Sequence, residues 1–385
     1  MARAAVVAGL VFFHAALVFD TTDDFYVKND RTADLIPVVA PAVLWAMPLL
    51  FLAAGVGAGH SWRRWGTGGY LRRRVRRLLV PLVAGTVLLV PIPVWFRLRA
   101  DGSSTESYAA FWPRFFQVRW DWSEFPFALQ PATAGGGFEF GHLWFLVLLL
   151  FYSVLTLPLL WWLVTDRGRR ATSWLVTAAG RRGSTLVPAV LVGAVTAELG
   201  LDEGIAAWNV EAYLLFFVAG VLLAADSRFR EVVRRDARLT ASVALAAFVV
   251  AGVVLLGAEP GADPLLDRDG SSLSGRAAFG VAGWCATLAI VGALAGRAHG
   301  AGAGARTSSG LRRQAVAGYV RAAVLPWYVL HQPVVVAVAF VVVGWDLGPV
   351  PKYGIICAAS VVLTLGLYDL LVRRTAVTRA LFAGA

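Results

Sequence analysis

Long apolar runs recur from one end of the chain to the other, and short polar segments rich in glycine, proline or arginine separate them. Each run has roughly 17 or more residues, which is enough for an α-helix to cross about 30 Å of hydrocarbon. The pattern predicts ten transmembrane helices, at residues 3–20, 37–59, 77–96, 143–164, 185–201, 209–225, 239–257, 277–296, 322–343 and 354–372. We therefore expect an all-α, polytopic integral membrane protein in which residues 1–385 form a single transmembrane domain.

The composition and the distribution of charge support a membrane location. Of the 385 residues, 58% are hydrophobic and 15% are charged, whereas a soluble domain carries about 25% charged residues. If the ten helices alternate across the bilayer, the side with both termini collects about 26 basic and about 5 acidic residues, and the other side about 9 basic and about 19 acidic ones. The positive-inside rule then places both termini in the cytoplasm and accounts for the net charge of +11 without a nucleic-acid partner.

The segments between the predicted helices are too short to form a separate soluble domain. The longest, at about 97–142 on the outer side, contains the aromatic stretch SYAAFWPRFFQVRWDWSEFPF, which is typical of a helix lying in the membrane interface. We expect cytoplasmic loops near residues 60–76, 165–184, 226–238 and 297–321. The chain contains no evident internal repeat, which argues against a secondary transporter because many transporters are built from such repeats.

The first apolar run, RAAVVAGLVFFH, carries a basic residue at each end. Arg3 and His14 are eleven residues apart, so on a helix they share nearly the same face and lie about 16 Å apart along its axis. Arg3 at the cytoplasmic surface has an ordinary explanation, because arginines there orient the helix and extend toward water. His14 lies within the hydrocarbon, where an ionisable side chain is costly and usually faces a cavity or a partner.

The chemistry of these two side chains suits a long ligand with an anionic end. Near neutral pH a histidine is largely uncharged, so His14 could act as a general base toward a hydroxyl group. It could equally be part of a proton relay. Arg3 could bind a phosphate at the cytoplasmic face. An acyl-coenzyme A, with phosphates at one end and a reactive thioester at the other, fits both positions.

Several segments resemble, in order along the whole chain, the integral-membrane acyltransferases of the acyltransferase 3 family. They are RAAVVAGLVFFHAALVF (3–19), the stretch 47–85, GHLWFLVLLLFYSVL (141–155), LPWYVLHQPVVV (325–336) and YDLLVRR (368–374). Within that family the sequence is most similar to the glucan-modifying, succinyltransferase-like branch. The resemblance implies a multi-pass enzyme of the cell membrane that O-acylates a carbohydrate with acyl-CoA as donor, and it makes His14 the expected catalytic residue.

The resemblance also implies that a basic run after the second helix binds the phosphates of coenzyme A. In YLRRRVRRLLVP the arginines are Arg72, Arg73, Arg74, Arg76 and Arg77. The positive-inside rule explains any single one of them equally well. Five arginines within six positions nevertheless form a strong trap for an anion. The candidates for donor binding are therefore Arg3, Arg72, Arg73 and Arg76.

Two further histidines are candidates for the catalytic site. His142 begins the fourth predicted helix beside a tryptophan, and it could be an ordinary interfacial residue. His331 lies in the ninth helix and could simply bond to another helix. Pro333, two residues later, removes a helical N–H and could open a backbone carbonyl toward a ligand. The family signatures around both histidines favour a place near the reaction centre.

A carboxylate would help to orient His14 as a base, as it does in catalytic triads. The candidates are Asp20, Asp24, Glu198 and Glu211, each of which could also be a solvated charge near the outer surface. The two cysteines lie inside predicted helices and form no CxxC pair or His–Cys cluster, so no metal cofactor is expected.

Two functions from other classes remain open beside acyl transfer. A proton-coupled transporter or flippase would use His14 and His331 as a relay, and a membrane scaffold would use neither histidine for chemistry. The acyltransferase reading predicts acyl-CoA, a saccharide or glycan acceptor at the outer face, and membrane lipids as the partners of the chain.

Overall fold

The computed structural model describes residues 2–21, 25–33, 35, 39–133, 136–259, 261–300 and 308–384. Within them, six helical segments are long and apolar enough to cross a membrane: Ala46–Ala100, Glu203–Ala225, Arg228–Leu256, Gly270–Gly296, Gln314–Val342 and Pro349–Val372. Three shorter apolar helices span Ala2–Leu17, Gly141–Leu155 and Leu186–Leu199. This architecture fits the expected all-α membrane protein. The number of ten helices, the cytoplasmic placement of both termini and the single domain stay predictions.

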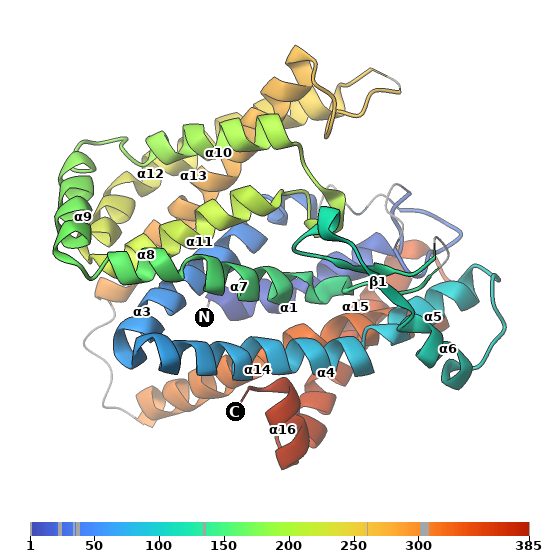
Figure 1. Cartoon of the computed structure of the whole chain (residues 1–385). Helices are drawn as coiled ribbons and strands as arrows, with labels where there is room; N and C mark the ends of the chain where they lie inside the picture. Colours follow the sequence, from blue (N-terminus) through green and yellow to red (C-terminus); the bar gives the residue numbers. More distant parts are fainter. Residues whose placement is uncertain are drawn as a thin grey trace. The chain divides into compact units, whose positions relative to one another are not determined.

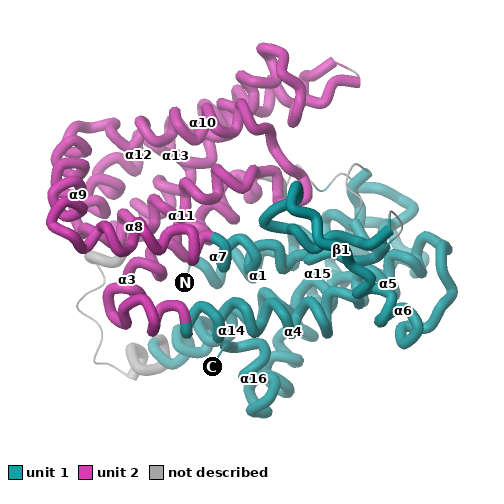
Figure 2. The backbone as a smooth tube through the Cα atoms, viewed as in Figure 1, with its two compact units in different colours: residues 1–40, 72–151, 312–385 teal, residues 41–71, 152–311 magenta. Residues whose placement is uncertain are grey.

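The described chain divides into two compact units, each made of segments that are distant in the sequence (Figure 2). Unit 1 comprises residues 1–40, 72–151 and 312–385, and unit 2 comprises residues 41–71 and 152–311. The elements η1 (Ala40–Ala42), α3 (Ala46–Arg74), α7 (Trp144–Leu155) and α14 (Ser308–Val342) contribute residues to both units. Unit 1 contains all seven site residues that the sequence identifies: His14, His142, His331, Arg3, Arg72, Arg73 and Arg76.

Unit 1 combines helices with one small sheet. Its other elements are α1 (Ala2–Leu17), η2 (Val75–Leu79), α4 (Val80–Leu88), α5 (Pro91–Ala100), α6 (Tyr108–Phe115), β1 (Val118–Trp120), η3 (Trp122–Glu124), β2 (Leu129–Pro131), η4 (Gly141–Leu143), α15 (Pro349–Leu367), η6 (Tyr368–Val372) and α16 (Ala376–Phe382). Helix α1 packs against α15, and α4 packs against α16 and η4 (Figure 1). Val7 and Val11 lie on the buried stripe of α1, and helical spacing puts His14 on the same stripe.

The aromatic stretch 107–127 does not form the single interfacial helix that the sequence suggested. Helix α6 is followed by strands β1 and β2, which pair antiparallel with Val118 opposite Pro131 and Trp120 opposite Leu129. Between the strands, the Asp121 carboxylate accepts hydrogen bonds from the backbone N–H and the hydroxyl of Ser123 and so caps the short 3-10 helix η3. Such local side-chain bonds favour turns over helices, so this part of the fold departs from an all-α chain.

The four segments expected to be cytoplasmic loops are largely helical. Helix α3 has a kink at Gly66, where φ is +63°, and its second part ends at Arg74. Helix α9 (Asp166–Ala178) fills most of the second segment, α12 (Arg228–Leu256) begins within the third, and α14 begins at Ser308 in the fourth. Residues 301–307 of the last segment lie outside the described residues. Arginine and leucine are good helix formers, so a basic segment can continue a membrane helix into water.

Unit 2 is a helical bundle with short connecting elements. It contains α8 (Leu157–Trp162), α9, α10 (Leu186–Leu199), η5 (Glu203–Ile205), α11 (Val210–Ala225), α12 and α13 (Gly270–Gly300). Helix α13 lies along both α10 and α12, and α11 contacts α10 and α12 (Figure 1). Thr196 on α10 donates a hydrogen bond of 2.9 Å to the carbonyl oxygen of Arg276 on α13.

Helices α3 and α11 approach each other closely in unit 2 because small residues face each other. A Cβ atom on Gly55 would collide with the carbonyl oxygen of Phe217, and one on Gly220 would collide with the backbone of α3. One turn further along, a Cβ atom on Gly59 would lie 2.9 Å from that of Ala224. Small residues at four-residue spacing on both helices permit close backbone contact between membrane helices.

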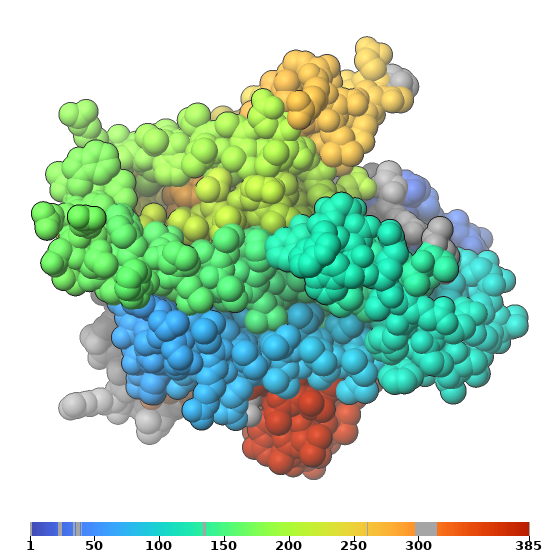
Figure 3. Space-filling view, in the orientation of Figure 1, coloured from blue at the N-terminus to red at the C-terminus, as the bar shows by residue number. Residues whose placement is uncertain are grey.

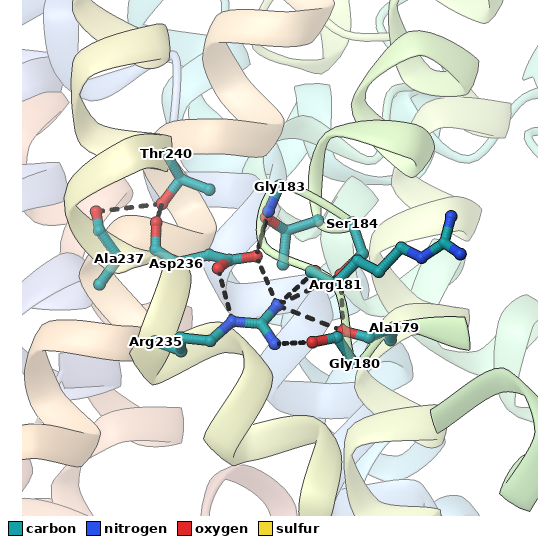
Figure 4. Close-up of polar contacts among 10 residues, drawn as sticks. Ala179, Gly180, Arg181, Gly183, Ser184, Arg235, Asp236, Ala237 and Thr240 are labelled. Atoms are coloured by element: carbon teal, nitrogen blue, oxygen red, sulfur yellow. Dashed lines mark hydrogen bonds and ion pairs between the residues drawn. The ribbon is translucent and has the colours of Figure 1, made fainter. Parts of the chain in front are cut away.

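Arg235 and Asp236 join α12 to the end of α9 (Figure 4). The buried carboxylate of Asp236 accepts hydrogen bonds from Thr185 Oγ1 at 3.1 Å and from Gly183 N at 3.2 Å, and it pairs with Arg235 at 2.8 Å. Arg235 also donates to the carbonyl oxygens of residues 179–181. A cation at a helix C-terminus satisfies carbonyls that have no helical donor, so this pair fixes α9 to α12.

We expect Gly55→Leu to destabilise unit 2, because the new side chain must push apart two backbones that are in contact. Overpacking of this kind costs about 1–3 kcal/mol. Thermal unfolding of the purified protein in detergent measures the loss. Gly252→Leu on α12 is the matched control, since a Cβ atom at that glycine meets nothing within 4 Å. Equal melting temperatures for the two variants would contradict the close packing of α3 on α11.

Candidate active site

Three histidines from distant parts of the sequence meet in unit 1. His14 comes from α1, His142 from η4 and His331 from α14. The ring centroid of His331 lies 5.3 Å from that of His14 and 5.3 Å from that of His142. His142 and His331 are buried, with exposed fractions of 6% and 0%, and His14 is partly exposed. The structure therefore brings together the three candidates for catalysis, while their roles stay predictions.

A proline in α14 explains how His142 is held. Pro333 has no N–H to donate to the carbonyl oxygen of Val329, four residues earlier. His142 Nε2 lies 3.0 Å from that oxygen and acts as its donor. In return, the hydroxyl of Tyr328 donates to the carbonyl oxygen of His142. The carbonyl that the sequence suggested might open toward a ligand is thus satisfied by a side chain of η4, and η4 is fastened to α14.

The hydrogen bonds of His331 determine which of its nitrogens can react. Its Nδ1 lies 2.7 Å from the carbonyl oxygen of Tyr328, which can only accept, so Nδ1 carries the proton and Nε2 of the neutral ring has a lone pair. Among the described residues, His331 Nε2, His14 Nδ1 and Gln332 Oε1 are buried without a hydrogen-bond partner. Buried polar atoms without partners mark places where a ligand or water is received.

A second set of polar side chains, Tyr26, Glu139 and Arg97, lies beside Gln332. The hydroxyl of Tyr26 donates to the carboxylate of Glu139, and the Gln332 amide is within hydrogen-bonding reach of the same hydroxyl. Arg97 packs its guanidinium over the Tyr26 ring, 4.4 Å from the centroid, and its Nη1 lies 3.6 Å from Glu139 Oε2. Burial and the Glu139 carboxylate raise the pKa of Tyr26 well above its usual value, so the phenol remains a proton donor at physiological pH.

Sequence reasoning did not identify Tyr26, Arg97 or Glu139. The available signal was the segment FEFGHLW, in which Glu139 stands between two phenylalanines just before the histidine motif. Gly141 has a φ of +48°, and a Cβ atom there would lie 3.2 Å from Tyr26 Oη and 3.3 Å from Glu139 Oε1. Only glycine combines this backbone conformation with such a close approach.

The arginines expected to bind the donor lie on a helical surface rather than in a loop. Arg72 and Arg73 belong to the last turn of α3, and Arg76 lies in η2, which is a π-helix. π-Helices are rare in proteins, and those that occur are often found at functional sites. Arg72 and Arg76 are exposed and Arg73 is half-buried. Arg3 of α1 comes close enough to Arg74 for the two positive charges to repel each other.

The comparison with known families agrees with this arrangement. The Acyl_transf_3 family model, described as an acyltransferase domain, matches residues 1–369 and so includes every residue of the site. The chain belongs to the acyltransferase 3 family. No curated protein and no solved structure matches it. Its apolar helices and its family make it a membrane acyltransferase.

The acyltransferase has, in its described part, no carboxylate bonded to Nδ1 of His14. Of the acidic candidates, Asp20 accepts the backbone N–H of the next residue, Glu198 and Glu211 belong to unit 2, and Asp24 is outside the described residues. The titratable groups that act electrostatically on His14 are His331 and His142. Across the described side chains, no group of three or more His, Cys, Asp or Glu residues has the arrangement of a metal site.

We expect the loss in the free energy of unfolding caused by His142→Ala to depend on the residue at position 333. In the otherwise unchanged acyltransferase, the substitution leaves the Val329 carbonyl buried without a donor, which costs about 1–3 kcal/mol. With Pro333→Ala present, the new N–H can bond to Val329 within the helix, so His142→Ala should cost clearly less. A double-mutant cycle on the free energy of unfolding measures the difference. Costs that simply add would show that His142 is not held through this carbonyl.

Proposed function

We propose that this membrane acyltransferase transfers an acyl group from cytoplasmic acyl-CoA to a hydroxyl group of a saccharide or glycan at the outer face of the cell membrane, as in the glucan-modifying, succinyltransferase-like branch of its family. The proposal rests on one observation. Three imidazole rings lie together beside Gln332, and His14 Nδ1, His331 Nε2 and Gln332 Oε1 are buried without hydrogen-bond partners among the described residues. Atoms that are desolvated and unpaired in the resting protein are available to a substrate.

In the proposed reaction His14 is the general base. It removes the proton of the acceptor hydroxyl while the oxygen attacks the thioester carbonyl, so that a C–O bond forms and the C–S bond breaks. The departing thiolate takes up the proton and leaves as coenzyme A. The ring of His331 is close enough to that of His14 to receive the proton directly or through a water molecule. His142 holds η4 against α14, and its ring centroid lies 5.3 Å from that of His331.

The arginines near the start of α1 and the end of α3 would bind the donor. Arg3 and Arg74 repel each other, and a phosphate between them would turn that repulsion into two attractive interactions. Arg72, Arg73 and Arg76 extend the positive surface along the helix. An elongated donor would then have its phosphates at these arginines and its thioester toward His14.

The acceptor would meet Tyr26, Arg97 and Glu139. These residues form a joined set of donors and acceptors, and the Arg97 and Glu139 side chains are about one-third exposed, at 28% and 30%. Saccharide hydroxyls are bound by such mixed polar groups, since each hydroxyl both donates and accepts. Gln332 reaches the Tyr26 hydroxyl and follows His331 in the chain, so it links the acceptor group to the histidines.

A proton-coupled transporter or flippase is the second candidate, because two imidazole rings 5.3 Å apart also suit a proton relay. It would move its substrate without consuming acyl-CoA. Membership of an acyltransferase family favours acyl transfer.

His14→Ala should abolish acylation, because loss of the general base removes a contribution of about 10²–10⁴ to the rate. Mass spectrometry of cell-surface glycans and lipids, with wild-type protein, the variant or no protein, detects the acyl mass that disappears. His60→Ala is the control, since the exposed His60 ring bonds only to the Val56 carbonyl of its own helix among the described residues. Acylation that persists in a His14→Ala protein of normal abundance would refute the proposed base.

Arg72→Gln combined with Arg73→Gln should weaken the binding of coenzyme A to the purified protein. Each charge-assisted hydrogen bond contributes about 1.5–3 kcal/mol, so loss of one such contact corresponds to a roughly 10- to 100-fold higher Kd. Isothermal titration calorimetry gives the value, and Arg182→Gln, which replaces an exposed arginine of unit 2, is the control. Unchanged affinity in the double variant would remove these arginines from the donor site.

A further inference from the structure

Unit 2 contains a pocket of about 380 Å³ whose lining includes none of the residues proposed for acyl transfer. Helices α3, α8, α9 and α11 and the first residue of α12 line it. Its walls are of two kinds. Apolar side chains come from α8 and the turn after it, with Leu160 and Leu163, and also from α3 and α11, with Trp62 and Val221; the three arginines come from α3, α9 and α12. A ligand that fits both walls has a charged part and an apolar part.

The three arginines retain many donors for a ligand. Arg63 donates from Nη1 to the carbonyl oxygen of Ala225 at 3.2 Å. Arg228 pairs with Asp226 at 2.8 Å and reaches Ser173 Oγ at 3.4 Å. Arg169 donates from Nη1 to the carbonyl oxygen of Val164 and from Nη2 to Asp166. Each guanidinium has five N–H donors in a planar fork, so in the described part of the chain these contacts leave several of them open.

The charge of the lining favours an anion. Arg63, Arg169 and Arg228 bring three positive charges to the pocket, against two carboxylates: Asp226 in the lining, and the exposed Asp166, which pairs with Arg169 Nη2 at 2.6 Å. Hydrogen bonds from Arg228 lower the pKa of Asp226, so it stays ionised and neutralises one arginine only. Bidentate geometry makes arginine well suited to phosphate groups, and the pocket also offers the hydroxyl of Ser173.

The helices around the pocket carry exposed tryptophans. Trp161 and Trp162 of α8 have exposed fractions of 68% and 40%, and Trp174 of α9 is 68% exposed. Figure 3 shows residues 157–178 at the surface of unit 2. Tryptophan is enriched where hydrocarbon meets lipid headgroups. A phosphate at the arginines would therefore lie at headgroup depth, with apolar side chains beside it.

The pocket walls are fixed rather than loose. The Arg235–Asp236 pair holds the end of α9 against α12 (Figure 4), and these two helices supply Arg169, Ser173 and Arg228 to the pocket. The backbones that carry two of the three arginines are thus fixed to each other before a ligand arrives, which reduces the entropic cost of binding.

We infer that this pocket binds the phosphate of an anionic phospholipid, whose acyl chains run over the apolar residues of α8. The lipid is a structural or regulatory ligand of unit 2, separate from the acyl donor and acceptor. Its binding does not rest on the proposed acyl transfer.

Native mass spectrometry of the full, delipidated chain tests this directly, with phosphatidylglycerol as probe and phosphatidylcholine as the zwitterionic comparison. Phosphatidylglycerol should remain bound preferentially, and Arg63→Gln should weaken its retention about tenfold, as expected for one charge-assisted contact. Arg230→Gln should leave retention unchanged, because Arg230 is an exposed arginine of α12 outside the pocket. Equal retention of the two lipids, or equal loss in both variants, would overturn the proposal.

Two further arms separate lipid from other ligands and from misfolding. Displacement of phosphatidylglycerol by inorganic phosphate or coenzyme A would assign the pocket to a soluble phosphate ligand and overturn the lipid assignment. Arg169→Gln repeats the test should Arg63→Gln fold poorly, since the Arg169 side chain is 64% exposed. Arg170→Gln on the same exposed helix is its control. Retention that falls only in Arg169→Gln supports the pocket.

Discussion

The hydrogen bond from His142 to the carbonyl oxygen of Val329 is the contact on which the site of this acyltransferase depends. Pro333 removes the helical donor for that oxygen, and a polar backbone group without a partner in the membrane costs several kcal/mol. A donor from outside the helix is therefore required. Because that donor is a histidine of η4, the same bond satisfies the Val329 carbonyl of α14 and brings the rings of His142 and His331 to a centroid distance of 5.3 Å.

Local features of the sequence were sufficient to find the histidines but not their partners. A histidine in an apolar run is conspicuous, and spacing along one helix places Arg3 and His14 on one face. The bonds that fix the site join residues far apart in the chain, such as Tyr26 to Glu139. No periodicity connects such positions. The same limit applies to the carboxylate expected beside His14, whose electrostatic neighbours are other histidines.

Polarity was a poor guide to secondary structure at the ends of the membrane helices. The basic segments expected to be loops continue as helices, and the arginines from Arg72 to Arg77 lie on α3 and a π-helix. Charged side chains reach water from a helix as readily as from a loop. For the aromatic segment the prediction was wrong in the opposite way, because a single helix was expected and strands are found. Its tryptophans suggested an interfacial helix, whereas strands β1 and β2 form a hairpin, with a backbone bond from Asp121 N to the carbonyl oxygen of Ala128 beside the strand pairs. Hydropathy locates such a segment in the interface without specifying its backbone.

Buried polar groups in the described part of this fold fall into two kinds, those with hydrogen-bond partners and those without. Asp236 and Arg276 are both buried and hydrogen-bonded. Asp236 bonds to Arg235 of α12 and to the loop after α9, and Arg276 donates to the carbonyl oxygens of Ala197 and Pro264. Groups of this kind fasten helices together and have little capacity left for a ligand. At His14 and His331, neighbouring ring nitrogens are buried and open. Since desolvating a polar atom without a bond is costly, such a pair persists most readily where a substrate completes it, which supports the proposal that the reaction takes place in unit 1.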